Sequence, residues 1–429
     1  MVKNFLNLSE KECKEEYDIL LTDYENFKLK NLKLDMSRGK PEARQLDLSL
    51  KMLDEINSKS DFKTSSGVDV RNYGICDGLP EVKKFISEVT GMDEKYFIVG
   101  GNSSLSMMFD AVSFFMIHGS CGQKPWCRQE KIKFLCPAPG YDRHFAICEY
   151  FGIEMVTVKM NKDGPDMDFI EDIVQNDSSV KGIWCVPKYS NPQGITYSDE
   201  VVRRFAALKP NAKDFKIFWD NAYFIHDLSS ESAPLLDIFA ECKKNKSEEM
   251  PIAFYSTSKI TFPGAGVAFL ACMGKNLENL KKMYSVKTVG FDKINQLRHL
   301  RFLKNKSNLY NHMQKHREIL KPKFELVLNL LKSEFRNNPI LKWNIPKGGY
   351  FISVDTSPGC AKETVRLCME AGVKLTSAGS TFPYGKDPYD SNIRLAPTYP
   401  DINDLKLAMK LFCLCVKLAY LKKKLGLCN

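Results

Sequence analysis

Lys259 is the residue of this sequence whose type and surroundings suggest covalent chemistry most directly. It follows the apolar run 252–255 and lies just behind Ser256 and Ser258. A lysine pressed against apolar neighbours loses part of its proton affinity, and its neutral amine can then attack a carbonyl and form a Schiff base. The chain contains 62 lysines and arginines, so a solvated surface amine is the ordinary alternative for any single lysine.

A carboxylate at the end of another apolar run could hold a ring. Asp220 directly follows residues 215–219. Such a carboxylate often only caps the next turn, but beside a pyridine ring it would keep the ring nitrogen protonated, and the protonated ring is the electron sink of pyridoxal phosphate chemistry. Tyr223 and Asn191 could donate hydrogen bonds to the ring oxygen. Tyr141 offers an aromatic face for stacking.

Two serines and an arginine could bind anions. Ser103 and Ser104 begin a helical pattern, and hydroxyls together with free backbone N–H groups at a helix start suit a phosphate. An ordinary N-cap is the alternative for these serines. Arg394 could hold a substrate carboxylate in a bidentate fork.

These residues have to be positioned by a sheet, because most of them follow short apolar runs. From about residue 90 such runs alternate with longer amphipathic stretches, which is typical of α/β proteins. The runs that end in polar or turn-forming residues are 97–99, 132–135, 182–186, 215–219 and 252–255. Ligands of open α/β sheets bind beyond the carboxyl ends of the strands, so five such strand ends predict one ligand-binding site at that edge of the sheet.

The strand signals become sparse beyond about residue 300, where a long helical pattern begins. We therefore expect an α/β fold with two domains, a large one with a mostly parallel central sheet flanked by helices and a smaller α+β one. The predicted division assigns residues 51–300 to the large, cofactor-binding domain and 301–429 to the C-terminal small domain. Residues 1–50 are predicted to be an N-terminal segment that belongs to the small domain.

The composition excludes several other classes of protein. With 429 residues, 44% of them hydrophobic and 27% charged, the chain is unlike a disordered tail, a collagen or a small disulfide scaffold. The net charge of +10 is mild and scattered, so neither nucleic acid nor a membrane is an expected partner. The six histidines show no metal spacing, so we expect no metal and structural roles for all six. The absence of a secretory leader predicts a cytoplasmic protein.

Several segments, in order along the chain, resemble the fold-type I aminotransferases that depend on pyridoxal 5'-phosphate. Within that class the resemblance is to the divergent aspartate aminotransferase-like branch, which is related to the aminotransferase domain of MocR. The segments span nearly the whole chain, and they are Ser-Arg-Gly-Lys-Pro-Glu (37–42), Arg-Asn-Tyr-Gly (71–74), Gly-Gly-Asn-Ser-Ser (100–104), Pro-Lys-Tyr-Ser-Asn-Pro-Gln-Gly (187–194), Trp-Asp-Asn-Ala-Tyr (219–223), Ser-Thr-Ser-Lys-Ile-Thr-Phe-Pro-Gly-Ala-Gly (256–266), Pro-Lys-Gly-Gly-Tyr-Phe (346–351) and Ile-Arg-Leu-Ala (393–396).

The resemblance implies a role for each candidate residue of the cofactor site. Lys259 would be the Schiff-base lysine and proton carrier, Asp220 would pair with the pyridinium nitrogen, and Asn191 and Tyr223 would hold the ring oxygen. Tyr141 would stack on the ring. The residues that would hold the phosphate are Ser103, Ser104, Ser256 and Ser258.

The resemblance also implies how substrate and a second subunit are bound. Arg394 would bind the α-carboxylate, with Asn191 beside it, and Gly39 would lie near the substrate on a mobile N-terminal segment. Tyr73 resembles the tyrosine that reaches the phosphate in the partner subunit, which implies a homodimer with shared active sites.

One position departs from the family pattern. Relatives commonly place an arginine eight residues after the lysine to neutralise the phosphate, and Val267 stands at that position here. A dicarboxylate substrate would also need a second cation. The candidates for it are Arg38, Arg143, Lys188 and Arg298.

The expected function is that of an aminotransferase moving an amino group from L-aspartate to 2-oxoglutarate by a ping-pong mechanism through pyridoxamine phosphate. An aminotransferase of aromatic, kynurenine or alanine specificity and a pyridoxal phosphate-dependent lyase are the alternatives, because site residues alone do not fix the reaction. A non-enzymatic MocR-like sensor is disfavoured, since the first matching motif begins at Ser37 and leaves no room for a DNA-binding domain before it. A nucleotide-binding protein is disfavoured because no Walker-type motif is present.

Overall fold

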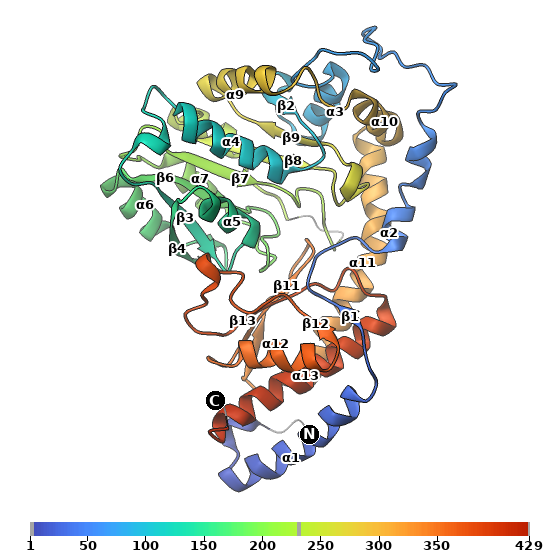
Figure 1. Ribbon diagram of the computed structural model, residues 1–429, viewed down its shortest axis with the longest axis vertical. Helices are drawn as coiled ribbons and strands as arrows, with labels where there is room; N and C mark the ends of the chain where they lie inside the picture. Colours follow the sequence, from blue (N-terminus) through green and yellow to red (C-terminus); the bar gives the residue numbers. More distant parts are fainter. Residues whose placement is uncertain (1–3, 230–232, 428–429) are drawn as a thin grey trace.

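The computed structural model describes residues 4–229 and 233–427. Two bodies are evident, a larger one around an eight-stranded sheet and a smaller one around a three-stranded sheet (Figure 1). A two-stranded sheet, β1 with β12, joins an N-terminal segment to the smaller body.

The large sheet is mostly parallel, as expected. The strands β3, β4, β6, β7 and β8 run parallel to one another, whereas β9 is antiparallel to both β2 and β8, and β5 is antiparallel to β4. Across the sheet the strands are β2 (Phe97–Val99), β9 (Ala268–Ala271), β8 (Pro251–Ser256), β7 (Lys216–Asp220), β6 (Val180–Cys185), β3 (Lys133–Ala138), β4 (Glu154–Asn161) and β5 (Gly164–Pro165). The predicted α/β class with a mostly parallel central sheet is therefore confirmed.

Helices cover both faces of this sheet, because alternate residues of the buried strands are apolar on each side. Phe134, Trp184 and Phe218 belong to the core on one face, which is covered by α4 (Ser104–His118), α5 (Asp142–Tyr150) and α9 (Gly274–Lys287). Ile183 and Trp219 belong to the core on the other face. That face is covered by α3 (Pro80–Thr90), α6 (Met167–Asn176), α7 (Asp199–Ala207), α8 (Ile238–Asn245) and α10 (Lys293–Leu303).

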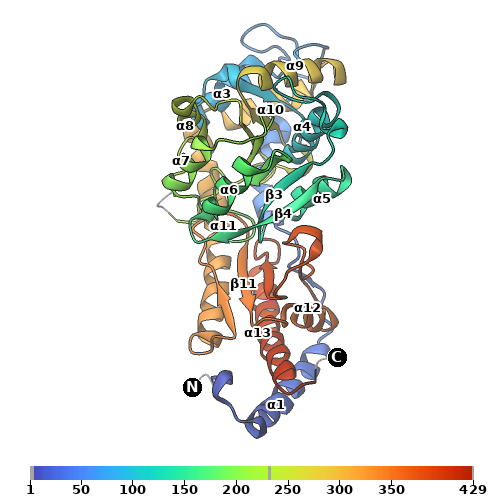
Figure 2. The ribbon, with the colours of Figure 1, turned by 90° about the vertical axis from the view of Figure 1, so that its left-hand side faces the viewer.

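The smaller body pairs its antiparallel sheet with three helices. Its strands are β10 (Leu341–Trp343), β11 (Ile352–Thr356) and β13 (Asn392–Leu395), with β11 in the middle. The helices α12 (Ala361–Glu370) and α13 (Ile402–Lys424) pack together, and α1 (Glu10–Lys28) lies across α13 (Figure 2). A capping box of Ser9 and Glu12 starts α1, and β1 (Leu34–Asp35) pairs with β12 (Val373–Lys374).

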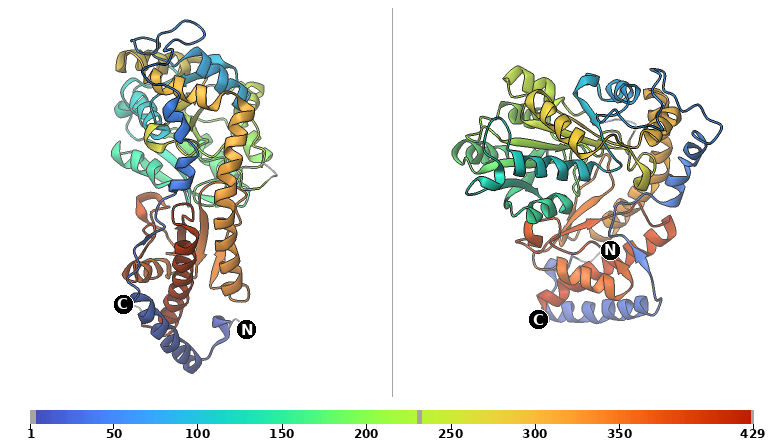
Figure 3. Two further views of the ribbon diagram at one scale, coloured as in Figure 1. Left: turned by 90° about the vertical axis from the view of Figure 1, so that its right-hand side faces the viewer. Right: turned by 45° about the horizontal axis from the view of Figure 1, so that its top comes forward.

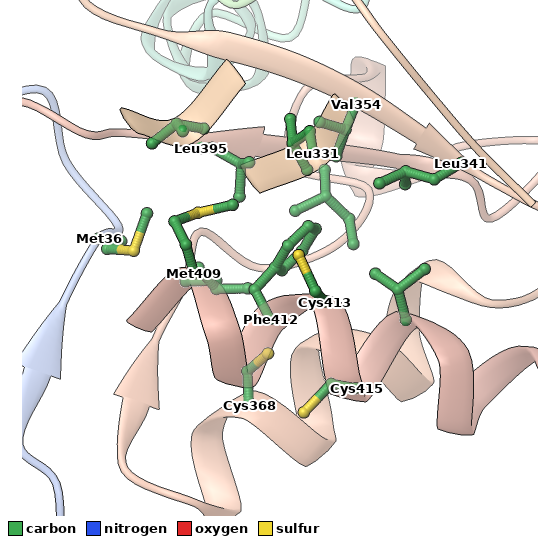
Figure 4. Packing of buried hydrophobic residues seen from close by; sticks show 14 of the residues in the cluster. Met36, Leu331, Leu341, Val354, Cys368, Leu395, Met409, Phe412, Cys413 and Cys415 are labelled. Carbon is green, nitrogen blue, oxygen red and sulfur yellow. The ribbon is translucent and has the colours of Figure 1, made fainter. Parts of the chain in front are cut away.

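The core of the smaller body is formed mainly by the buried face of α13. Met409, Phe412 and Cys413 of this helix point toward the sheet, where Val354 and Leu395 lie (Figure 4). All five side chains are buried. Burial of their apolar surface, at roughly 25 cal/mol per Å², stabilises the packing of α13 against the sheet.

One long helix connects the two bodies. α11 (Lys306–Phe335) contacts α3 and α10 of the larger body and α13 of the smaller one, and it runs along the long axis of the molecule (Figure 3). The short helix α2 (Ala43–Asp47) also contacts α11. α1 and β1 contact elements of the smaller body, and the division into residues 1–50, 51–300 and 301–429 stays a prediction.

Candidate active site

A cleft of about 730 Å³ lies between the two bodies, and side chains of both line it. It opens at the carboxyl ends of β6, β7 and β8, where the sequence predicted a site. Eleven of the predicted site residues line this cleft, namely Gly39, Ser103, Ser104, Tyr141, Asn191, Asp220, Tyr223, Ser256, Ser258, Lys259 and Arg394. Tyr73 does not line it, and its side chain is 83% exposed.

Lys259 lies in a single helical turn that follows β8. The turn is closed by the carbonyl of Thr257, which accepts hydrogen bonds from the amides of Ile260 and Thr261, each at 2.9 Å. The Lys259 Nζ atom faces two aromatic rings, 5.1 Å from the centroid of Tyr223 and 5.7 Å from that of Tyr350. Burial lowers the pKa of Lys259, although the charge of Asp220 opposes the shift. The amine is therefore more readily neutral than a surface lysine.

Asp220 ends β7, and only one of its two carboxylate oxygens has a hydrogen-bond partner among the described residues. Its side chain is buried, and Oδ2 lies 3.0 Å from Nε2 of His144. Oδ1 is buried with no hydrogen-bond partner among the described residues. A buried carboxylate oxygen is costly unless it is paired, so Oδ1 is suited to a protonated or cationic group in the cleft.

His144 is a site residue that the sequence reasoning missed. Its ring stacks on Trp184 with centroids 4.5 Å apart and an interplanar angle of 11°, and Tyr141 meets its edge at 4.9 Å. The expected purely structural role for this histidine is thus too narrow, because His144 holds Asp220 directly. A signal was available in the spacing, since His144 stands three residues after Tyr141, on the same face of the helix start.

The four predicted phosphate-binding serines line the cleft near the start of α4 and the end of β8. Ser103 precedes α4 and makes no capping hydrogen bond with its side chain, which leaves the hydroxyl and the helix N-terminus available to an anion. Ser256 and Ser258 approach from the end of β8, with Ser258 Oγ donating to the carbonyl of Asn102 at 3.4 Å. Val267 is buried, and its side chain lines a small apolar cavity instead of the cleft.

Arg394, on β13, brings a guanidinium from the smaller body into the cleft. The side chain is 6% exposed, and its Nη1 donates to Asp142 Oδ1 at 3.1 Å and to Asn191 Oδ1 at 3.2 Å. Its Nε is buried with no partner among the described residues, and its Cζ lies 4.8 Å from the ring centroid of Phe351. Asp142 was missed by the sequence reasoning because its contact with Arg394 joins two bodies.

The cleft has an excess of positive charge. Six cationic side chains line it, and Asp142 and Asp220 are the only carboxylates among its lining residues. The cationic side chains are those of Arg38, Lys40, Arg143, Lys259, Lys374 and Arg394. Substrates and cofactors with several negative charges therefore suit this cleft.

Two of the four cations predicted for a second carboxylate line the cleft, and two lie elsewhere. Arg38 and Arg143 line it. Lys188 is buried near Asp227, with 3.3 Å between Nζ and Oδ1. Arg298 donates to Asn295 Oδ1 at 2.6 Å and is not a lining residue.

Gly39 makes close approach of the N-terminal segment possible. A Cβ atom at this position would lie 2.6 Å from Cζ of Phe351, the ring that packs beside Arg394. Any side chain at residue 39 would therefore push the segment or the ring away from the Arg394 guanidinium.

Neither a metal-binding cluster nor a membrane-spanning helix is found within residues 4–229 and 233–427. No group of three or more histidine, cysteine, aspartate or glutamate side chains is placed to hold a metal ion there. In the same part of the chain, no helix has the length and apolar character needed to cross a membrane.

Comparisons with known proteins identify the family of this chain. The family model described as "Aspartate amino-transferase" matches residues 8–427. An aspartate aminotransferase of Corynebacterium glutamicum is 42% identical over 397 residues, which cover 92% of this chain and 91% of that protein. The crystal structure of an aspartate transaminase from the same species superposes with a TM-score of 0.95 at 39% identity, covering 99% of this chain and 100% of the other.

A more distant structure shares the fold. The α-aminoadipate aminotransferase LysN of Thermus thermophilus, complexed with N-(5'-phosphopyridoxyl)-L-leucine, has a TM-score of 0.73 at 19% identity and covers 92% of this chain and 94% of its own. Since the family model and the Corynebacterium relative both cover more than nine-tenths of the sequence, the chain belongs to the aspartate aminotransferase family of fold type I and is an aminotransferase.

Proposed function

We propose that this aminotransferase uses pyridoxal 5'-phosphate to move an amino group from L-aspartate to 2-oxoglutarate, in two half-reactions that pass through pyridoxamine phosphate. The observation that carries the proposal is the pair Lys259 and Asp220. The Lys259 amine, whose pKa is lowered by burial, and the Asp220 Oδ1 atom, which has no hydrogen-bond partner among the described residues, both belong to side chains that line one cleft. These are the two groups that a pyridine aldehyde cofactor requires of a protein.

The residues present fit the cofactor. Asp220 Oδ1 would hold its ring nitrogen, Tyr223 and Asn191 its ring oxygen, and Tyr141 would stack on the ring. Its phosphate would be held by Ser103, Ser104, Ser256, Ser258 and the N-terminus of α4. Bound there, the cofactor supplies a protonated ring that withdraws electrons from the substrate Cα.

The protein side chains then handle the protons. Lys259 Nζ takes a proton from the substrate Cα and returns one on the other side of the transfer. Burial, together with Asp220, raises the pKa of Tyr141 to about 12, and burial likewise raises the pKa of Tyr223. Both tyrosines therefore keep their hydroxyl protons and act as hydrogen-bond donors.

The substrate specificity follows from charge. Arg394 would bind the α-carboxylate through its free Nε and remaining N–H groups. The positive excess of the cleft remains after a phosphate is added, which favours a substrate with a second carboxylate. Arg38 and Arg143 are the predicted candidates for that carboxylate that line the cleft.

We further propose a homodimer in the cytoplasm. Tyr73 is exposed and does not line the cleft of its own chain, so its expected contact with a cofactor phosphate requires a second copy of the chain. Ten of the thirteen cysteines among the described residues are buried, which suits a reducing compartment.

A coupled assay tests the proposal. The protein, loaded with pyridoxal 5'-phosphate, should form at most one oxaloacetate per active site from L-aspartate alone, and should turn over repeatedly only when 2-oxoglutarate is present. Lys259→Ala should abolish this activity, whereas Lys275→Ala, at an exposed lysine of α9, should retain it. Activity with L-phenylalanine, kynurenine or L-alanine in place of L-aspartate would contradict the assigned donor. No transamination of any of these donors would overturn the proposal.

A further inference from the structure

Five of the six histidines surround the catalytic residues of this chain, and four of them contact the turn that carries Lys259. His144 holds Asp220, as described above. The other four come from the loop after β7, from α10 and from α11. They are His226, His299, His312 and His316, and all are buried.

The turn needs these contacts because it is too short to satisfy its own backbone. Residues 257–261 form one helical turn, and the last carbonyls of a helix have no partner within it. A buried carbonyl without a hydrogen bond costs free energy. His226 Nε2 lies 3.3 Å from the carbonyl oxygen of Lys259, and His299 Nε2 lies 2.9 Å from the hydroxyl of Thr261.

The carbonyl of Ile260 is held by two imidazoles at once. His312 Nε2 lies 2.7 Å from this oxygen and His316 Nε2 lies 3.0 Å from it. The two histidines are four residues apart on α11 and therefore share one face of the helix. A carbonyl oxygen only accepts hydrogen bonds, so we assign the proton of each ring to Nε2. The two Nε2 atoms also lie 3.2 Å from each other, as two N–H groups that converge on one oxygen do.

The far side of His316 fixes the same tautomer independently. Gln45 Oε1 accepts from the backbone amide of Glu42 at 3.3 Å, so Gln45 Nε2 is oriented toward His316 Nδ1, at 3.1 Å, and toward Tyr350 Oη, at 2.9 Å. Because Gln45 donates, His316 Nδ1 must accept. Gln45 is fully buried on α2, shortly after the cleft-lining segment 37–40.

We propose that His312 and His316 are positioning residues for Lys259. Their N–H groups hold the Ile260 carbonyl, and Gln45 links this contact to the N-terminal segment and to Tyr350, whose ring faces the Lys259 amine. The role rests on the function proposed above, because it matters to catalysis only if Lys259 is the reacting lysine. Burial lowers the pKa of His316 to about 4, so the ring stays neutral and keeps its Nδ1 acceptor at neutral pH.

Two substitutions of His316 separate hydrogen bonding from packing. His316→Phe keeps a ring of similar shape and loses the N–H, whereas His316→Gln loses the ring and keeps an amide N–H that can reach the same oxygen. His118→Phe is the matched control, since His118 is exposed at the far end of α4. Gln45→Met removes the donor to His316 Nδ1 and leaves both histidines in place.

The first measurement is hydrogen exchange of the Ile260 and Thr261 amides in the cofactor-free protein. We expect these amides to exchange about tenfold faster in His316→Phe, because the substitution removes one buried hydrogen bond that stabilises the turn. Exchange in His316→Gln should stay within about twofold of the unsubstituted protein. Gln45→Met should also accelerate exchange, and it decides the matter if His316→Phe does not fold.

The second measurement uses the loaded enzyme. In His316→Phe, kcat should fall about tenfold while KM for L-aspartate changes little, because Arg394 is untouched. Exchange that stays slow in His316→Phe and in Gln45→Met would overturn the inference, and so would faster exchange in His316→Gln than in His316→Phe. If the unsubstituted protein binds no cofactor, the proposed function fails, and the exchange result still reports on the turn.

Discussion

Replacing Asp220 by asparagine removes one negative charge from the cleft with almost no change of shape. The Oδ2 contact with His144 at 3.0 Å can persist with an amide, so the substitution acts mainly on Oδ1, which is buried and unpartnered. Removing one member of a buried charge pair typically costs about 3–5 kcal/mol. At about 1.4 kcal/mol per factor of ten, kcat should fall by about 10²- to 10⁴-fold.

The same substitution should change its neighbours in a defined direction. The Asp220 charge opposes the lowering of the Lys259 pKa and contributes to the raised pKa of Tyr141. Its loss should therefore lower the pKa of both groups, which makes the Lys259 amine more reactive at neutral pH in the cofactor-free protein. For Asp220→Asn we therefore expect a lower kcat in the loaded enzyme and a faster acetylation of Lys259 by acetic anhydride in the cofactor-free protein.

The assay is steady-state kinetics with L-aspartate and 2-oxoglutarate, read beside the dissociation constant of the cofactor. Asp214→Asn is the matched control, because Asp214 is equally buried but pairs with Lys181 at 2.8 Å and with Trp126 at 3.0 Å, away from the cleft. The control should lower the melting temperature and leave kcat unchanged. A kcat of Asp220→Asn within about fivefold of the unsubstituted enzyme would refute the assigned role, since a lost buried charge pair is worth far more.

Three further predictions concern the substrate, the second subunit and acid stability. Arg394→Lys should raise KM for both substrates by about 10- to 100-fold, because the planar fork is lost; an unchanged KM in a substrate titration would place the carboxylate elsewhere. Tyr73→Phe should raise the dissociation constant of the cofactor by about tenfold, and equilibrium dialysis giving equal retention would count against a shared site. Burial lowers the pKa of His226, His299 and His316 to about 3, 4 and 4. The unfolded chain therefore takes up these protons first as the pH falls through 6.5, so the urea midpoint should drop between pH 6.5 and 4, and a flat midpoint would contradict neutral burial.

The residues that the sequence places correctly are those with local signals. Ser104, Asp220 and Lys259 each follow an apolar strand directly, or with a short turn between, and parallel strands bring their carboxyl ends to one edge. Their meeting in a single cleft needed only the sheet topology, which the alternation of strands and helices already implied.

The residues that the sequence does not reveal depend on contacts between distant elements. His144 meets Asp220 across 76 positions, and Asp142 meets Arg394 across 252. The histidines of α11 approach the Lys259 turn only because α11 crosses from one body to the other. For the α11 histidines, no composition, periodicity or spacing in the chain carries that information, so each of them, considered in the sequence alone, is indistinguishable from an ordinary core residue.

The most direct test of the central claim is the visible absorption spectrum of the purified protein with added pyridoxal 5'-phosphate. We expect a band of the lysine-bound cofactor that bleaches when L-aspartate is added and returns with 2-oxoglutarate, and that is missing in Lys259→Ala. A band that ignores L-aspartate and responds to another amino acid would contradict the assigned donor. If no band forms with excess cofactor, Lys259 is not the reacting amine and the account of the site is wrong.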